Sequence, residues 1–529
     1  MVDAGLRVSS ATGRWGLVVC VLASALASID ATVVNVALPA IGQDLTADLA
    51  ALQWTVTAYT LTLASFILLG GALGDRYGRR RLLIVGAVWF AVASLLCGLA
   101  PTAAVLVVAR ALQGVGGALL VPASLAVIQA SFRPDDRARA IGAWTGLSGV
   151  ATAVGPFLGG WLIGALSWRW VFGVNLPLAI LVVVLARVHL PETRDANATG
   201  RVDLAGAVLG ALALGGLTYG LIALPGAGLA SPQVLAALTT ALLGAVAFVM
   251  VERRLRHPML PLGLFRSRQF SGANAVTFIL YGAFGGILFL LAVVLQVVSG
   301  FSALAAGTAL LPITVIMLLF SARAGRVATV IGPRIPMTVG PLICAAAMLL
   351  MLRIGPDASY VADVLPAMVV WGLGLAVLVA PLTATVLAAV ADRHAGVASG
   401  VNNAVARAAA LLAVSALPAV AGLSGNDAAD PAALNHGWRV AVVVAAAALL
   451  TGSLVALLTV RGGRAALQGS SAAAGPDRPA AASPPTAQLP TKIRYDSSVP
   501  TAATEVTVAR AEPVMRSCRA TSATRSTAR

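Results

Sequence analysis

Long apolar runs recur along most of the chain, and they constrain the fold more than any other feature. An apolar run of about 20 residues is long enough to cross the hydrocarbon core of a bilayer as a helix. The chain has 529 residues, of which 59% are hydrophobic and only 11% are charged. Soluble domains carry about 25% charged residues, and a mean hydropathy of +0.91 also argues against a soluble fold. The composition therefore predicts an all-α polytopic membrane protein.

The apolar runs predict fourteen transmembrane helices. Their predicted bounds are 15–38, 53–73, 82–99, 104–130, 138–162, 170–188, 204–224, 232–250, 270–298, 303–321, 336–352, 361–390, 398–421 and 438–460. The first run is too long for the roughly 7–15-residue apolar segment of a signal peptide. We therefore interpret it as the first span, preceded by a cytoplasmic N-terminus at residues 1–14.

The arginines support this number of spans because they gather in every second loop. Membrane proteins keep Arg and Lys in their cytoplasmic loops. The loops predicted to be cytoplasmic contain Arg76, Arg79, Arg80, Arg81, Arg133, Arg137, Arg139, Arg187, Arg194, Arg201, Arg253, Arg254, Arg256, Arg266, Arg268, Arg323, Arg326, Arg334 and Arg393. The opposite loops contain only Arg169, Arg353 and Arg439. This alternation predicts a multi-pass protein of the cell (inner or plasma) membrane with both termini in the cytoplasm. It also explains the net charge of +16 without nucleic-acid binding.

The last part of the chain has a different composition. Residues 461–529 are rich in Ala, Ser, Thr, Pro and Arg and contain few large apolar side chains. Such a segment cannot bury a hydrophobic core. It is therefore predicted to be a disordered cytoplasmic tail.

Few charged side chains are predicted to lie well inside the spans: Asp30, Arg110 and Arg407, with Asp363 near the outer end of the twelfth. A charge inside a span costs at least about 2.5–3.5 kcal/mol and usually marks a pathway or a pair. Burial disfavours the charged form of a carboxylate, whereas a nearby arginine favours it. Asp30 could therefore load and release a proton with Arg110 as its partner. The alternative is a static Asp–Arg pair that holds two helices together.

Polar residues near Asp30 form a candidate substrate cavity, to which we assign Asp30, Asn35, Gln113 and Asp363. Arg110 and Gln113 are three residues apart and share one face of the fourth span. Asn35 lies about 140° around the first span from Asp30. A structural hydrogen bond is therefore the competing role for Asn35.

Two further segments carry conspicuous small and charged residues. GALGDRYGRRRLL (71–83) connects spans two and three, and its charges could form a lock that holds one conformation; the candidate residues are Gly71, Asp75, Arg76, Gly78 and Arg79. ATAVGPFLGG (151–160), in span five, places small residues every four positions, which permits close helix contact. Pro156 removes a backbone donor there and bends the helix.

Taken together, these segments resemble the major facilitator superfamily, and specifically its fourteen-span drug:proton antiporters of the EmrB/QacA type. GALGDRYGRRRLL resembles the signature between spans two and three. LVVARALQGVGGA (106–118) resembles the span-four signature, whose arginine is thought to serve proton transfer and corresponds to Arg110. ATAVGPFLGG resembles the antiporter signature, which here retains Gly155, Pro156, Gly159 and Gly160. IDATVVNVALP (29–39), WRWVFGVNLP (168–177) and AGVASGVNNAVARAAALLAV (395–414) also resemble this subfamily.

The resemblance implies a major facilitator fold with two six-helix bundles, at 15–188 and 270–460. Residues 189–269 would contain cytoplasmic linkers and two inserted transmembrane helices. It further implies export of small amphipathic compounds by alternating access, driven by the proton gradient without a cofactor. The expected partners are protons, a small-molecule substrate and the lipid bilayer. The protein is expected to be a monomer and, in a Gram-negative cell, to work with a periplasmic adaptor.

Some positions depart from the family pattern. Thr329 stands where the second half should carry an acidic residue, and Ala151 replaces the first glycine of the antiporter signature. Spans two, ten and thirteen contain no Asp or Glu. This favours neutral, anionic or monocationic substrates over dications.

Other functions remain as alternatives. A specific metabolite exporter or a proton symporter would use the same fold, and a non-transporting membrane sensor is a remote possibility. An enzyme is not expected, because the four histidines and four cysteines form no catalytic or metal-binding pattern. The chain also has no GxxxxGK[ST] phosphate-binding loop, so ATP is not expected to drive it.

Overall fold

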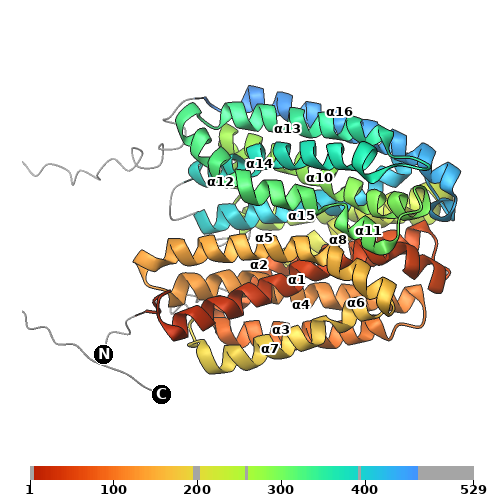
Figure 1. Cartoon of the computed structure of the whole chain (residues 1–529). Coiled ribbons are helices and arrows are strands. Elements are labelled where there is room, and N and C mark those ends of the chain that lie inside the picture. The colour runs from red at the N-terminus through yellow and green to blue at the C-terminus, as the bar shows by residue number, and fades with distance from the viewer. Residues whose placement is uncertain (1–4, 195–202, 256–259, 391–394, 463–529) are drawn as a thin grey trace, which may run out of the picture. The chain divides into compact units, whose positions relative to one another are not determined.

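The computed structural model describes residues 5–194, 203–255, 260–390 and 395–462, and these ranges are almost entirely helical (Figure 1). Within them, fourteen helical segments are long and apolar enough to cross a membrane. This number confirms the sequence prediction. Nearly all of the predicted tail, from residue 463 on, lies outside the described residues.

The first half of the chain forms seven helices that make up six spans. They are α1 (Ala11–Asp44), α2 (Leu49–Tyr77), α3 (Arg79–Gly98), α4 (Ala103–Ser131), α5 (Pro134–Ala165), the short α6 (Trp170–Gly173) and α7 (Asn175–His189). α8 (Leu204–Ala227) and α9 (Pro232–Arg254) follow as two further spans.

The second half forms the remaining six spans. Its elements are the 3-10 turn η1 (Leu262–Arg266), α10 (Arg268–Val297), α11 (Ala303–Thr308), α12 (Leu311–Ile331), α13 (Arg334–Leu350), η2 (Met351–Arg353), the π-turn η3 (Tyr360–Val364), α14 (Leu365–Ala388), α15 (Ala395–Val420), η5 (Asp427–Ala429) and α16 (Pro431–Thr459).

Polar residues just before the apolar runs begin several of these helices. The Asp48 carboxylate accepts a hydrogen bond from the Ala51 amide at the start of α2, at 2.9 Å. The Thr102 hydroxyl does the same for Val105 at the start of α4. Such caps pair backbone N–H groups that would otherwise have no partner inside the helix.

Most of the observed helices are longer than the predicted spans. The largest difference is in α12, which continues to Ile331 although its span was predicted to end at 321. The charges of Arg323 and Arg326 suggested that boundary. Arginine can extend its charged end from a helix that continues, so the charge does not end the helix.

Contacts between helices divide the protein into two bundles and an inserted pair. α1–α7 pack mainly on one another, and so do α10 and α12–α16, whereas the short α11 packs mainly on α5 of the first bundle. α8 and α9 form a hairpin, and α8 contacts both α2 of the first bundle and α15 of the second. The inserted pair therefore lies against the seam between α2 and α15.

The two bundles join mainly at one face of the membrane-spanning region. We call the face where α1 ends and α2 begins the far face, and the face where α1 begins and α16 ends the terminal face. The Leu49 amide donates to the Gly425 carbonyl oxygen at 2.8 Å, and the Gln296 side chain donates to the Val36 carbonyl oxygen at 3.0 Å. Both bonds join the bundles at the far face.

The distribution of buried apolar side chains agrees with this. The far-face half of the first bundle, including Val33 and Phe172, shares one continuous core with the second bundle. The terminal-face half, including Leu26 and Val127, forms a separate core. The continuous core therefore joins the two bundles at the far face.

α5 shows the same asymmetry along one of its faces. A Cβ added at Gly160 would lie 2.5 Å from the Ala303 carbonyl oxygen of α11. Gly142, Gly146 and Gly149 lie on the same side of α5, because five helical turns separate Gly142 from Gly160. A Cβ at these three positions would meet no atom within 4 Å. The glycine-lined face of α5 is therefore packed against the second bundle only near the far face.

A valine at Gly160 should open the far face, because the added side chain would collide with α11. We expect spin labels that replace the exposed residues Leu166 and Val361 to move apart in Gly160→Val, as measured by double electron–electron resonance. Gly142→Val is the matched control on the same face of the same helix and should leave this distance unchanged. An unchanged distance in Gly160→Val would contradict the packing described above.

Candidate functional site

Asp30 lies in the middle of α1 and is completely buried. It occupies the boundary between the two apolar cores, since Ala27 belongs to one and Val33 to the other. A charge in this position needs hydrogen-bonding partners, because no bulk water reaches it.

Three side chains from two other helices satisfy the Asp30 carboxylate. Arg110 Nη1 of α4 donates to Asp30 Oδ2 at 2.5 Å. Gln113 Nε2, also of α4, donates to Oδ1 at 2.7 Å, and Asn175 Nδ2 of α7 donates to the same oxygen at 2.9 Å. Both carboxylate oxygens are therefore engaged.

Arg110, like Asp30, is buried and hydrogen-bonded to other helices. It is 1% exposed, and its Nε donates to the Thr55 carbonyl oxygen of α2 at 3.0 Å. Its guanidinium lies 4.4 Å from the centre of the Tyr59 ring and 5.7 Å from that of Phe172. Cation–π contacts of this kind stabilise a desolvated arginine.

Gln113 extends the network to α3. Its Nε2 also donates to the Ser94 hydroxyl at 2.7 Å, and its Oε1 accepts from Arg110 Nη1 at 2.5 Å. Asn175 donates to the same Ser94 oxygen at 3.2 Å. The resulting cluster ties together α1, α2, α3, α4 and α7.

This arrangement connects the charge of one carboxylate to several helices. Asp30 is the only carboxylate in the cluster, and its protonation would cancel the charge that now holds Arg110. Because each hydrogen-bond partner of Asp30 belongs to a helix, a change in the charge of Asp30 would alter contacts with several helices at once.

The structure brings together three of the predicted site residues and separates two others. Asp30, Arg110 and Gln113 are in direct contact. Asn35 instead donates to the Ala31 carbonyl oxygen of its own helix at 3.3 Å. Asp363 lies in η3 at the far face, where it accepts hydrogen bonds from Arg353 Nε at 3.2 Å and the Ser359 amide at 2.9 Å.

Ser94, Asn175 and Tyr59 were not predicted to belong to the site. Asn175 falls in the segment WRWVFGVNLP, which already stood out by its resemblance to known antiporters. Ser94 and Tyr59 had no such signal, because a serine or tyrosine inside a span is common and only the fold shows which helix it faces.

Two residues of the predicted charge lock, Asp75 at the end of α2 and Arg79 at the start of α3, form an ion pair across the turn between these helices. Arg79 donates to Asp75 Oδ1 through Nε at 2.9 Å and Nη2 at 2.7 Å. Gly78 has φ +113°, a left-handed conformation that favours glycine and permits the sharp turn into α3. Gly71 packs near Pro122 of α4, and the Arg76 guanidinium lies 5.4 Å from the Tyr77 ring centre.

Glu192, which was not predicted to belong to this site, also contacts the turn between α2 and α3. Its carboxylate accepts from the amides of Arg80 at 3.1 Å and Arg81 at 3.2 Å, the first turn of α3. A negative charge is stabilising there because the helix N-terminus is positive. A Cβ at Gly78 would lie 2.6 Å from Glu192 Oε1, so this contact also requires the glycine.

The small residues of the antiporter signature bring α5 against two helices. Added side chains at Gly155 and Gly159 would collide with Thr32 and Val33 of α1, close to Asp30. Pro156 lies on another side of α5, where its carbonyl oxygen faces Gly307 of α11. Gly160 faces α11 as well.

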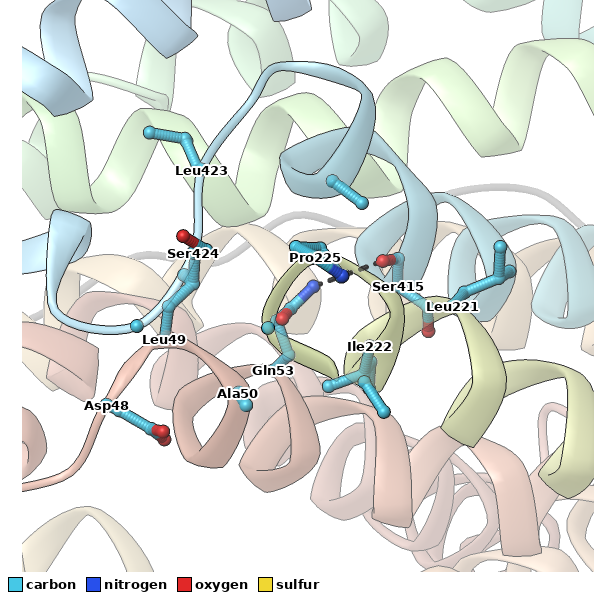
Figure 2. A pocket seen from close by; sticks show the side chains of 14 residues that line it. Asp48, Leu49, Ala50, Gln53, Leu221, Ile222, Pro225, Ser415, Leu423 and Ser424 are labelled. Atoms are coloured by element: carbon cyan, nitrogen blue, oxygen red, sulfur yellow. Dashed lines mark hydrogen bonds between the residues drawn. The ribbon is translucent and has the colours of Figure 1, made fainter. Parts of the chain in front are cut away.

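A small cavity of about 170 Å³ lies at the far face, between the start of α2 and the ends of α8 and α15 (Figure 2). Gln53 crosses it and donates to the carbonyl oxygens of Val414 at 2.8 Å and Ser415 at 3.2 Å. Asp30 and Arg110 do not line it. This cavity is therefore distinct from the buried polar cluster.

The sequence matches the family model of the Major Facilitator Superfamily over residues 20–414. The chain belongs to the major facilitator superfamily. This assignment fits the arrangement of the helices in two bundles.

Several antibiotic resistance and export proteins are similar over most of the chain. The puromycin resistance protein of Streptomyces alboniger is 38% identical over 88% of this chain and 95% of its own length. The methylenomycin A resistance protein of Bacillus subtilis is 35% identical over 79% and 90%. The tetracenomycin C resistance and export protein of Streptomyces glaucescens is 36% identical over 72% and 70%.

Solved structures of the superfamily share the fold at low identity. A D-xylose–proton symporter superposes with a TM-score of 0.60 at 16% identity, covering 84% of this chain and 97% of its own. A bacterial homologue of the human lysosomal transporter Spinster gives 0.60 at 16% identity, covering 87% and 99%.

Breaking the buried pair from either side should destabilise the protein strongly. Arg110→Gln and Asp30→Asn should each cost about 3–5 kcal/mol of unfolding free energy, because each leaves a buried group without its partner. The double variant should cost clearly less than the sum of the two. Denaturant unfolding of the purified protein in detergent measures all three values.

The exposed pair of Arg169 with Asp44, also 2.5 Å apart, provides the matched control. Arg169→Gln should cost only about 0–1 kcal/mol, because solvent screens this pair. Equal costs for Arg110→Gln and Arg169→Gln would contradict a stabilising role for the buried pair.

Proposed function

We propose that this protein exports small amphipathic compounds in exchange for protons. The observation that carries the proposal is the Asp30–Arg110 pair, a carboxylate buried at mid-depth with a complete set of donors. Relatives that are identical at more than a third of the aligned positions are named as antibiotic resistance or export proteins. Together these support drug efflux coupled to the protonation of Asp30.

Alternating access requires a site that two bundles expose in turn. The bundles of this protein contact each other mainly at the far face, and the glycines of α5 nearer the terminal face meet no neighbour. We infer that the structure represents a state closed at the far face. Rocking of the bundles would pack Gly142, Gly146 and Gly149 against the second bundle and separate Gly160 from α11.

The distribution of arginines indicates which face of the protein lies in the cytoplasm. Loops at the terminal face hold most of the basic residues, including Arg79, Arg80 and Arg81, and such loops remain in the cytoplasm. With both termini cytoplasmic, the described state faces inward. A compound would enter from the cytoplasmic side, and protonation of Asp30 would accompany the return from the outward-facing state.

Asp30→Asn should abolish efflux driven by a pH gradient, because an amide cannot bind and release the proton. Fluorescent-substrate transport in proteoliposomes with an imposed pH gradient measures this. Exchange of substrate between the two sides without a gradient should continue, since it needs bundle motion but no proton.

Asp44→Asn is the control on the same helix, because Asp44 is exposed and lies at the far face. It should retain gradient-driven efflux. Full gradient-driven transport by Asp30→Asn would rule out Asp30 as the proton-binding group, and accumulation in the opposite direction in everted vesicles would rule out export.

A further inference from the structure

Arg407, in the middle of α15, is a second arginine at membrane depth, and its surroundings differ from those of Arg110. No hydrogen bond or ion pair within the described ranges involves Arg407, and its Nε is buried without a partner. The residue as a whole retains partial exposure. Arg110, by comparison, has a carboxylate, an amide and a carbonyl as partners.

The position of Arg407 on α15 places it between the two bundles. Residues seven apart on a helix lie on nearly the same face, so Gly400, Arg407 and Val414 form one stripe. At one end, a Cβ on Gly400 would lie 3.1 Å from Leu68 of α2. At the other end, the Val414 carbonyl oxygen accepts from Gln53 of α2. Arg407 therefore lies on the face of α15 that meets α2.

The groups around Arg407 leave its charge unbalanced. The titratable groups that interact with it electrostatically are the hydroxyls of Tyr59 on α2 and Tyr281 on α10. Neither is a carboxylate. Asn402, one turn and a half earlier on α15, is engaged with Asn274 and Thr277 of α10. An unpaired cation in a membrane span is costly, and such residues usually serve a substrate or ion.

We propose that Arg407 binds the anionic group of the transported compound, a carboxylate or phenolate oxygen. A planar guanidinium with unused donors matches such oxygens and can bind a carboxylate through two bonds. The seam that contains it is flanked by α8, whose contacts with α2 and α15 shield it from lipid on that side. Figure 1 shows α15 at the border of the second bundle.

The same position links substrate to the proton site. Tyr59 interacts with both arginines, since the Arg110 guanidinium lies 4.4 Å from its ring centre and its hydroxyl is within electrostatic range of Arg407. That hydroxyl donates to the Ala27 carbonyl oxygen at 3.2 Å, one turn from Asp30. The inference rests on the proposed transport function and specifies the chemistry of its substrate.

Binding of a matched pair of probes tests the inference without a proton gradient. 2-Naphthoate and 2-naphthamide have nearly the same shape, but only the first is an anion. We expect the full-length protein in nanodiscs of zwitterionic lipid to bind naphthoate about tenfold more tightly than naphthamide, measured by calorimetry. Arg407→Gln should lose this preference, whereas Arg407→Lys should keep only part of it, because lysine retains the charge but lacks the two parallel donors.

Several outcomes would overturn the inference. They are equal binding of the two probes to the unmodified protein, no naphthoate binding at millimolar concentration, and an unchanged preference in Arg407→Gln. Loss of naphthoate binding when phosphatidylglycerol replaces zwitterionic lipid would assign the site to lipid headgroups instead. The two proposals can fail separately. If the protein prefers naphthoate through Arg407 but shows no proton-driven efflux, the proposed function is refuted and this inference is retained.

Discussion

The buried ion pair of Asp30 with Arg110 is the interaction on which the first bundle depends. Hydrocarbon offers no water to compensate a charge, so each side of the pair requires protein donors and acceptors. Gln113 and Asn175 supply them for the carboxylate, and the Thr55 carbonyl oxygen supplies one for the guanidinium. The pair and these partners together come from four different helices. The electrostatic requirement of one pair therefore fixes the relative placement of α1, α2, α4 and α7, in addition to any role in proton transfer.

Such short polar contacts are possible only where helices approach closely, and glycine permits this. An added Cβ at Gly114, one turn after Arg110 on α4, would collide with the Thr62 hydroxyl and the Tyr59 carbonyl oxygen of α2. Gly155 and Gly159 have the same relation to α1, next to Asp30. In membranes, helices gain little from hydrophobic burial, so packing of small residues and polar contacts must stabilise their association. The glycine pattern and the polar cluster are thus parts of one arrangement.

Much of this architecture could be predicted from the sequence, for identifiable reasons. Span number followed from apolar length and from the alternation of arginines, and Asp30, Arg110 and Gln113 stood out because charge and amide groups are rare inside spans. Ser94 and Glu192 could not be predicted, since their roles depend on which helix ends and faces they meet in three dimensions. Asp363 was misleading as a cavity candidate because its carboxylate is engaged locally by Arg353 and the Ser359 amide. The periodicity of a sequence shows which residues share one face of a single helix, whereas a site such as the Asp30 cluster is formed by residues from several helices.

Arg110 and Arg407 would have different roles in coupling proton binding to substrate binding. A ligand shifts a conformational equilibrium only through its different affinity for the two states. The partners of Asp30 all belong to the first bundle and would move with it, so bundle rocking alone leaves the proton site intact. Arg407 faces α2 across the seam, and rocking changes its surroundings directly. The affinity of Arg407 for substrate would therefore depend directly on the conformation. A proton on Asp30 would instead act through a rearrangement inside the first bundle. Tyr59 could transmit that rearrangement, because it contacts Arg110 and is within electrostatic range of Arg407.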